Sequence, residues 1–236
     1  MGGDLPAWRL LPLGETGTLV GRAAPGGARY GAAEALRWTA VGYRALVAAE
    51  RPAVVLDLVP AAETVLVHHE PGTAAAVRAW LDAVLPTAAA APDQPWPDPG
   101  AAGPLPVPVS YDGEDLDGVA RACGLPVSRV VAVHAGTLWR VAFVGFAPGF
   151  GYLTPAAGVR RADLAALLTV TRRSEPRHRV PAGSIALAGG YTGVYPRSGP
   201  GGWQLLGHTE LPLWDLDADP PAQLWPGRLV RFEATR

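Results

Sequence analysis

A run of proline, glycine and alanine divides the chain into two parts with different sequence patterns. Seven prolines fall between Pro86 and Pro106, with Ala88–Ala91 and Gly100–Gly103 among them. Proline lacks the backbone N–H that helices and central strands need, and proline-rich segments are extended and semi-rigid. The sequence therefore predicts two domains, residues 1–86 and 107–236, joined by a Pro/Ala/Gly-rich linker over residues 87–106.

The first part has the pattern of a small α+β domain. Apolar residues recur at helical spacing over residues 32–50, which predicts an amphipathic helix. β-Branched residues at 54–59 and 64–67 predict two strands, and Thr73 is a candidate N-cap for a second helix. Short strands around two helices indicate a small open-sheet domain.

The second part begins with two short helices and continues as strands. The first helix has one apolar face and ends at Gly124, and the second covers residues 127–133. Strands are predicted at 139–144, Ser184–Ala188, Gly193–Tyr195, Trp203–Leu206 and Leu229–Phe232. Several short strands with Gly- and Pro-containing turns between them predict a closed or nearly closed β-barrel.

Composition excludes several classes of function. The chain has 20 basic and 21 acidic side chains, so it lacks the basic excess of proteins that bind nucleic acids or membrane surfaces. It contains no lysine, which excludes a P-loop, a Schiff-base lysine and a biotinyl or lipoyl carrier site. The single cysteine excludes an internal disulfide. With no long apolar run and no signal-peptide pattern at residues 1–13, we expect a soluble cytoplasmic protein.

The densest candidate site is the segment Phe143–Leu153. Its glycines allow positive φ angles or close backbone approach, Pro148 fixes a turn, and the aromatic residues could line a pocket. The alternative is an aromatic-packed turn between two strands.

A second candidate site is the arginine-rich segment 172–184. Four arginines lie within eight residues beside prolines, and planar guanidinium groups suit a carboxylate or a phosphate. A solvated basic loop is the alternative. A third candidate, residues 191–203, contains a Gly-rich turn whose N–H groups could hold an anion, although hairpins use such turns too.

The histidines and the cysteine give weaker signals. His68 and His69 are adjacent in a predicted strand and face opposite sides, which argues against a shared metal ion. Cys123 lies on an apolar helix face and is expected in the core. His134 is a candidate general base, and a core or capping histidine is the alternative. No metal site is predicted.

Four motifs occur in a fixed order along the second part. They are G-F-x-P-G-F-x-Y-L at Gly145–Leu153, P-R-x-x-V-P-A-G-S at Pro176–Ser184, T-G-V-Y-P at Thr192–Pro196 and S-x-P-G-G-W at Ser198–Trp203. With them the chain resembles the B subunit of bacterial ATP-dependent 5-oxoprolinase, a family also called allophanate hydrolase subunit 1 that includes Kip-type histidine-kinase inhibitors. Upstream, the segment from Tyr111 to Leu116 and His134 fall where the family has a Tyr-Gly-Gly…Asp-Leu segment and a histidine.

The resemblance implies a fold and an activity. The fold is an α+β N-terminal domain followed by a mainly-β cyclophilin-like barrel. The activity is conversion of 5-oxo-L-proline, ATP and water to L-glutamate, ADP and phosphate. The C and A subunits of 5-oxoprolinase are implied as partners, with Mg²⁺ and ATP shared with them. The lack of lysine predicts no biotin on this chain, and the balanced charge predicts no nucleic acid or membrane as partner. Phosphorylation of the stable lactam would make it a better electrophile, so catalysis would depend on positioning and charge neutralisation.

The resemblance also implies site residues. Arg173 and Arg177 would contact an anion and His134 would transfer a proton. Substrate would be bound by Gly145, Phe146, Pro148, Gly149, Phe150, Ser184, Thr192, Gly201 and Gly202.

The sequence departs from the family pattern at three positions. Tyr191 stands where glutamine is usual, His208 where arginine or lysine precedes threonine, and Arg228 where aspartate follows glycine. Two other functions share the motifs: an inhibitor module that binds a sensor histidine kinase, and a carboxyltransferase-like or allophanate hydrolase component of urea metabolism.

Overall fold

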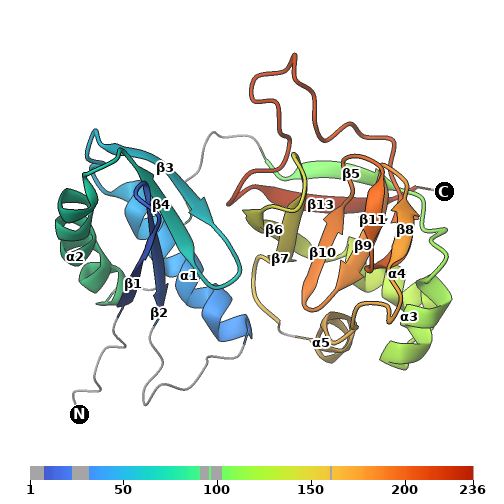
Figure 1. Cartoon of the computed structure of the whole chain (residues 1–236). Helices are drawn as coiled ribbons and strands as arrows, with labels where there is room; N and C mark the ends of the chain where they lie inside the picture. Colours follow the sequence, from blue (N-terminus) through green and yellow to red (C-terminus); the bar gives the residue numbers. More distant parts are fainter. Residues whose placement is uncertain (1–7, 23–31, 91–95, 97–102, 160, 236) are drawn as a thin grey trace, which may run out of the picture. The chain divides into compact units, whose positions relative to one another are not determined.

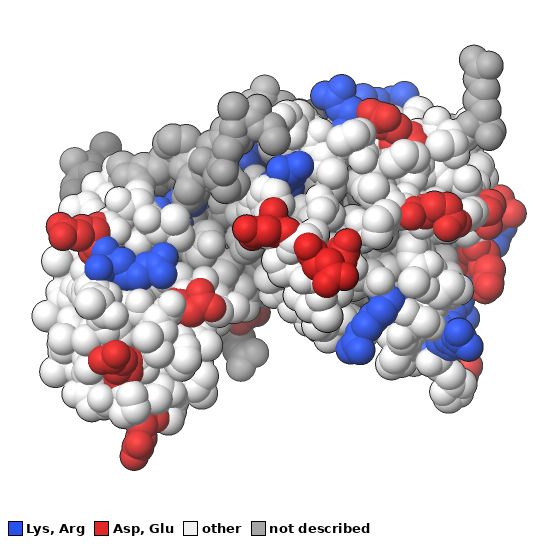
Figure 2. Space-filling view, turned by 90° about the horizontal axis from the view of Figure 1, so that it is seen from above, with Lys and Arg blue, Asp and Glu red and all other residues white. Residues whose placement is uncertain are grey.

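The structure is a computed structural model that describes residues 8–22, 32–90, 96, 103–159 and 161–235. It contains two compact units, Met1–Pro99 and Gly100–Arg236. The division falls inside the proline-rich segment, most of which lies outside the described residues. Among those residues, no helix is long and apolar enough to cross a membrane. On the face shown in Figure 2, charged side chains of both signs are interspersed with uncharged surface.

The first unit is a four-stranded antiparallel sheet with two helices packed on it (Figure 1). The strand order is β1-β2-β4-β3. The elements are β1 (Trp8–Leu13), β2 (Gly17–Arg22), α1 (Ala32–Ala48), β3 (Val55–Pro60), β4 (Val65–His69) and α2 (Ala74–Ala90). Leu46 of α1 and Leu81 of α2 are fully buried against Val65 and Val67 of the sheet. The helices and strands predicted here are confirmed, whereas β1 and β2 were not predicted.

The second unit is a seven-stranded sheet that closes almost completely on itself. Its strand order is β12-β9-β10-β7-β6-β13-β5, and a bridge between Ser110 and His208 connects the two ends. The strands are β5 (Leu105–Val109), β6 (Leu138–Val144), β7 (Gly151–Pro155), β9 (Ser184–Ala188), β10 (Tyr191–Val194), β12 (Gln204–His208) and β13 (Leu229–Ala234). The predicted barrel fold is confirmed.

Three helices and a small ribbon complete this unit (Figure 1). They are α3 (Leu116–Cys123), α4 (Val127–Ala135), α5 (Ala162–Leu168), and the ribbon of β8 (Arg177–Val180) with β11 (Gly199–Gly201). Gly124 ends α3 in the left-handed conformation, with φ 65°, as its place after the apolar face predicts. Trp139, Leu153 and Phe232 are fully buried in the main core of the unit.

Regular structure extends into both ends of the segment 87–106 that was predicted as a linker. Helix α2 continues through Pro86 to Ala90. At the other end, Leu105 already belongs to β5, whose Val107 and Val109 point into the barrel core. Pro106 and Pro108 fit this strand because β5 is the edge of the sheet and pairs only with β13 in the described residues.

Candidate functional site

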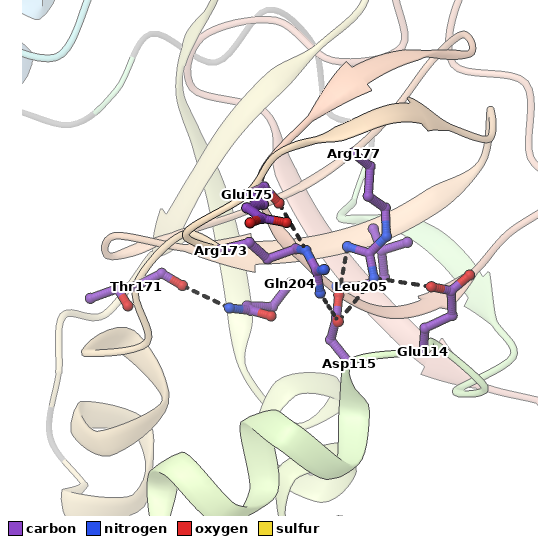
Figure 3. A network of polar contacts seen from close by, with 8 residues as sticks. All are labelled: Glu114, Asp115, Thr171, Arg173, Glu175, Arg177, Gln204 and Leu205. Carbon is purple, nitrogen blue, oxygen red and sulfur yellow. Dashed lines mark hydrogen bonds and ion pairs between the residues drawn. The ribbon is translucent and has the colours of Figure 1, made fainter.

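The carboxylate of Asp115 is the centre of a polar network in the second unit (Figure 3). Asp115 directly precedes α3, and its side chain is 9% exposed. Its Oδ2 accepts a hydrogen bond of 2.8 Å from the backbone N–H of Leu205 in β12. Its Oδ1 accepts hydrogen bonds from Nη1 of Arg173 at 2.8 Å and from Nη2 of Arg177 at 2.9 Å. One carboxylate thus connects the start of α3, strand β12 and the two arginines predicted to bind an anion.

Arg177 makes two further contacts with acidic side chains. Its Nη1 lies 2.9 Å from Oδ2 of Asp115, so each nitrogen faces one carboxylate oxygen. Its Nη2 also donates to Oε2 of Glu114 at 3.1 Å. The Arg177 side chain is 14% exposed, whereas that of Glu114 is 77% exposed. The buried partner of Arg177 is therefore Asp115, and the solvated partner is Glu114.

The network keeps its members ionised. Burial acts against the charged form of Asp115, but the hydrogen bonds from Arg177 and Leu205 and the charges of both arginines outweigh it. The pKa of the Asp115 carboxyl is therefore held below its ordinary value. The hydrogen bond from Arg177 to Asp115 likewise raises the pKa of the guanidinium above its ordinary value, against the effect of burial.

Backbone and side-chain contacts hold Arg173 in place. Its backbone N–H donates to the carbonyl of Gly202 at 2.8 Å, and its Nε donates to the carbonyl of Glu175 at 3.3 Å. Its side chain is 35% exposed, and Nη2 contacts no protein group in the described part of the chain. Arg173 thus has one guanidinium nitrogen available to a ligand.

Seven aromatic rings form a continuous aromatic layer in the same unit. Neighbouring ring centroids within it are 4.4–6.2 Å apart, mostly edge to face, which is the favourable packing of aromatic pairs. The layer consists of Phe143, Phe146, Phe150, Tyr152, Tyr191, Tyr195 and Trp203. Tyr152 and Tyr191 are half-buried, and Phe146 is exposed.

Gly201 and Gly202 lie where the aromatic layer meets the arginine network. Gly201 pairs with Arg177 across the ribbon, and a side chain at Gly201 would overlap the phenol of Tyr195. Gly202 supplies the carbonyl that accepts from Arg173. These two predicted site residues thus bring rings and guanidinium groups close together, and the absence of a side chain at Gly201 makes room for the Tyr195 ring.

Arg172 lies near two of the tyrosines. Burial raises the pKa of Tyr152 and of Tyr195, and the positive charge of Arg172 opposes that effect at both. Arg172 is exposed, so it adds a third positive charge beside the aromatic layer.

The predicted turn Gly145–Phe150 joins β6 to β7. Phe146 has φ 69°, unusual for a residue with a side chain, and its ring is 62% exposed. Gly149 has φ 79° and packs against Trp214. A shallow hollow of about 410 Å³ is lined by residues 144–149 together with Trp214, Ala222 and Leu224. The predicted pocket residues of this turn therefore lie together beside a real depression, except Phe150, which is buried in the aromatic layer.

His134 is fully buried among aromatic side chains. Its ring stacks on Phe232 with the centroids 4.5 Å apart and contacts Trp139 at 5.2 Å. The Tyr111 hydroxyl lies 2.7 Å from Nδ1, and the Thr192 hydroxyl lies 2.8 Å from Nε2. Burial lowers the pKa of His134 to about 3. His134 is 0% exposed, so a substrate does not reach its ring in this structure, and the position does not support the expected proton transfer.

The hydrogen bonds around His134 have one consistent direction. The Thr192 hydroxyl donates to the carbonyl of Ala186 at 3.0 Å, so it accepts from His134 Nε2–H. Nδ1 then accepts from the Tyr111 hydroxyl. Thr192 and Ser184 are 0% and 4% exposed, so both predicted substrate contacts are buried side chains.

In the ranges between 8 and 235 that the structure covers, no three His, Cys, Asp or Glu side chains come together as ligands. His69 instead contacts the hydroxyls of Thr18 and Thr73, and its neighbour His68 points to the opposite, exposed side.

Sequence patterns do not identify the two acidic residues of the network. Asp115 stands out only as part of the segment Tyr111–Leu116, and Glu114 beside it belongs to no predicted site. The available signal is charge balance: two members of the arginine cluster, Arg173 and Arg177, become partly buried and need acidic partners. The chain separates Asp115 from Arg177 by 62 residues, so no local pattern identifies the pairing.

Comparisons with known proteins agree with this fold. Over 129 aligned residues, or 53% of the chain, it is 47% identical to the B subunit of 5-oxoprolinase from Escherichia coli O157:H7. It is 40% identical to the protein of that name from Bacillus subtilis (strain 168) over an alignment of the same length. The alignments cover 56% and 50% of those relatives, so the chain spans about half the length of the curated relatives it matches.

A solved structure covers more of the chain. The crystal structure of TTHA0988 superposes with a TM-score of 0.67 and 32% identity, covering 93% of this chain and 40% of that protein. The family described as carboxyltransferase domain, subdomain C and D, matches residues 8–224, which include both units and the arginine network. The chain belongs to this family of carboxyltransferase domains.

Proposed function

We propose that this chain is a subunit of an ATP-dependent 5-oxoprolinase, acting with the A and C subunits of that enzyme. Two relatives that are 40–47% identical carry the name of the 5-oxoprolinase B subunit. The observation that carries the proposal is the pair of guanidinium groups on Asp115. Gly201, which pairs with Arg177, and Gly202, which accepts from Arg173, connect this pair to Tyr195 of the aromatic layer. A carboxylate on a small ring is a ligand that matches both parts.

The proposed substrate is 5-oxo-L-proline, a five-membered lactam with one carboxylate. Overall, one 5-oxoproline, one ATP and two water molecules give L-glutamate, ADP and phosphate. Arg173 and Arg177 would bind the carboxylate by charge-assisted hydrogen bonds, and the half-buried rings of Tyr152 and Tyr191 would pack on the lactam. This chain would therefore bind and orient the substrate.

In the described residues no three His, Cys, Asp or Glu side chains come together, and Asp115, the carboxylate at the centre of the network, is already paired with two arginines. The arginines nearest the site are paired with acidic side chains, which leaves limited positive charge for a triphosphate.

The test is reconstitution. The purified chain is expected to show no 5-oxoproline-dependent ATP hydrolysis, whereas co-expression with the A and C subunits should give glutamate and phosphate in equal amounts. An active preparation free of partners would contradict the division of roles. Inhibition of sensor-kinase autophosphorylation by the chain, with an inactive reconstituted complex, would support the inhibitor function instead.

A further inference from the structure

Glu114 and Asp115 are adjacent acidic residues with different environments. Asp115 is 9% exposed and contacts two arginines and the Leu205 N–H. Glu114 is 77% exposed, and its one contact in the described residues is Nη2 of Arg177. The Asp115 carboxylate is therefore a buried part of the network, and the Glu114 carboxylate is exposed to solvent at its edge (Figure 3).

Asp115 alone does not balance the charge of the two arginines. Two guanidinium groups share the single carboxylate of Asp115, which leaves one positive charge. Glu114 neutralises this charge through a solvated contact, and solvated ion pairs are weak. A ligand carboxylate that replaced Glu114 would accept a hydrogen bond from the same atom, Nη2 of Arg177.

We propose that Arg173 and Arg177 form a monocarboxylate-binding site that Glu114 occupies when no ligand is present. Nη2 of Arg177 donates a hydrogen bond to the Glu114 carboxylate. Nη2 of Arg173 donates no hydrogen bond to a protein group among the described residues. Both guanidinium groups contact the same oxygen of Asp115, so they lie within reach of one small ligand. A bound carboxylate would displace Glu114 and leave the pairs with Asp115 intact.

This inference rests on the proposed function only for the identity of the ligand as 5-oxoproline. The electrostatics make a prediction of opposite sign for the two neighbouring acids. Glu114→Gln removes the competing anion while retaining the size of the side chain. Asp115→Asn removes the charge that holds both arginines in place.

The experiment is calorimetric titration of the full chain with 5-oxo-L-proline. We expect Glu114→Gln to bind about two- to fivefold more tightly than wild type, the range expected for loss of an exposed ion pair. Asp115→Asn and Arg177→Ala should each bind at least about tenfold more weakly. The matched control is Glu175→Gln: it removes the same charge nearby, but only the backbone carbonyl of Glu175 contacts Arg173.

A second ligand isolates the carboxylate. 5-Oxo-L-prolinamide has the same ring without the charge, and Glu114→Gln should not strengthen its binding. Equal changes in 5-oxoproline affinity for Glu114→Gln and Glu175→Gln would overturn the inference, and so would weaker binding by Glu114→Gln. It is also overturned if neither wild type nor Glu114→Gln binds 5-oxoproline at millimolar concentration. The expected pattern with an inactive reconstituted complex would refute the proposed function and leave the carboxylate site standing.

Discussion

The guanidinium of Arg177 faces the carboxylate of Asp115 with one nitrogen on each oxygen, both at 2.9 Å. The two side chains are 14% and 9% exposed. Nη2 makes the hydrogen bond, and the buried Nη1 adds an ion contact without a hydrogen bond of its own. A single ammonium group cannot reproduce this planar arrangement of two nitrogens. The orientation matters because the same Nη2 also faces Glu114 and the proposed ligand.

Arg177 should therefore be the most sensitive position of the proposed site. In the reconstituted complex, Arg177→Ala should lower oxoproline-dependent glutamate release about 10²–10³-fold, because it removes a charge-assisted contact to the substrate. Arg177→Lys should restore little of this rate, since lysine keeps the charge but loses the planar pair of donors.

Arg179 provides the matched control for this substitution. It lies in the same strand and is exposed, and its Nε donates to Ser198 at 3.0 Å. Arg179→Ala should change the rate less than about threefold, in line with ordinary surface substitutions. Near-normal turnover by a folded, assembled Arg177→Ala complex would remove Arg177 from the site.

Asp115 should matter for stability as well as for binding. Asp115→Asn leaves two partly buried guanidinium groups without their shared anion, and we expect the free energy of unfolding to fall by about 2–4 kcal/mol at neutral pH. Chemical denaturation monitored by tryptophan fluorescence would measure this. The carbonyl of asparagine can still accept from Leu205, so a loss much below 1 kcal/mol would show that the charge contributes little.

The effect of Asp115 should depend on pH in one direction. Its pKa is lowered below the ordinary 3.8, so its stabilising contribution is present above that pH and is lost as the pH falls through the lowered value. The difference in unfolding free energy between wild type and Asp115→Asn should thus be constant near neutrality and shrink below about pH 3.8. A difference that grew on acidification would contradict the ion-pair network.

Local patterns predicted much of the fold because the core follows them. The helical spacing over residues 32–50 predicted α1, and Gly124 ends α3 as expected. The alternation that begins at Trp139 corresponds to a face buried in the core as far as Val141, where a register shift ends it and leaves Phe143 in the aromatic layer. Strand β5 was missed because its sequence Leu-Pro-Val-Pro-Val has proline at alternate positions. Its prolines are tolerated only because β5 forms a sheet edge, which is a property of the tertiary structure.

The site was predicted less completely, for a physical reason. Motifs showed where glycine and proline shape the backbone, and the turn at Gly145–Gly149 does line a hollow. They could not show that Arg173 and Arg177 share Asp115, because that contact joins distant segments. They also could not separate a catalytic His134 from a buried one, since burial depends on rings as far along the chain as Phe232.

Two of the predicted site glycines should respond differently to a methyl group. At Gly201 an added Cβ would overlap the Tyr195 phenol, whose ring is 3% exposed and cannot move without disturbing the aromatic layer. Gly201→Ala should therefore lower the free energy of unfolding by about 1–3 kcal/mol. Gly145 has open space around its Cβ position and a negative or extended φ, so Gly145→Ala should cost less than about 0.5 kcal/mol. Equal effects in thermal melts would contradict the close approach at Gly201.

The pH dependence of stability distinguishes a structural His134 from a catalytic one. His134 is neutral in the folded chain because burial lowers its pKa to about 3, whereas the unfolded chain takes up a proton below the ordinary 6.5. The unfolded state therefore binds more protons between these values, and His134 makes stability fall as the pH drops through 6.5 toward 3. The slope from this one residue is about 1.4 kcal/mol per pH unit.

His134→Gln retains hydrogen-bonding groups but cannot titrate. At pH 7 it should cost about 2–4 kcal/mol, because it leaves a cavity between Trp139 and Phe232 and disturbs the hydrogen bonds to Tyr111 and Thr192. That deficit relative to wild type should shrink by about 2 kcal/mol between pH 7 and pH 5, since only wild type loses stability through this residue. Urea denaturation at the two pH values would measure both quantities. A variant with wild-type stability at both pH values and no turnover in the reconstituted complex would instead establish His134 as the group that transfers a proton.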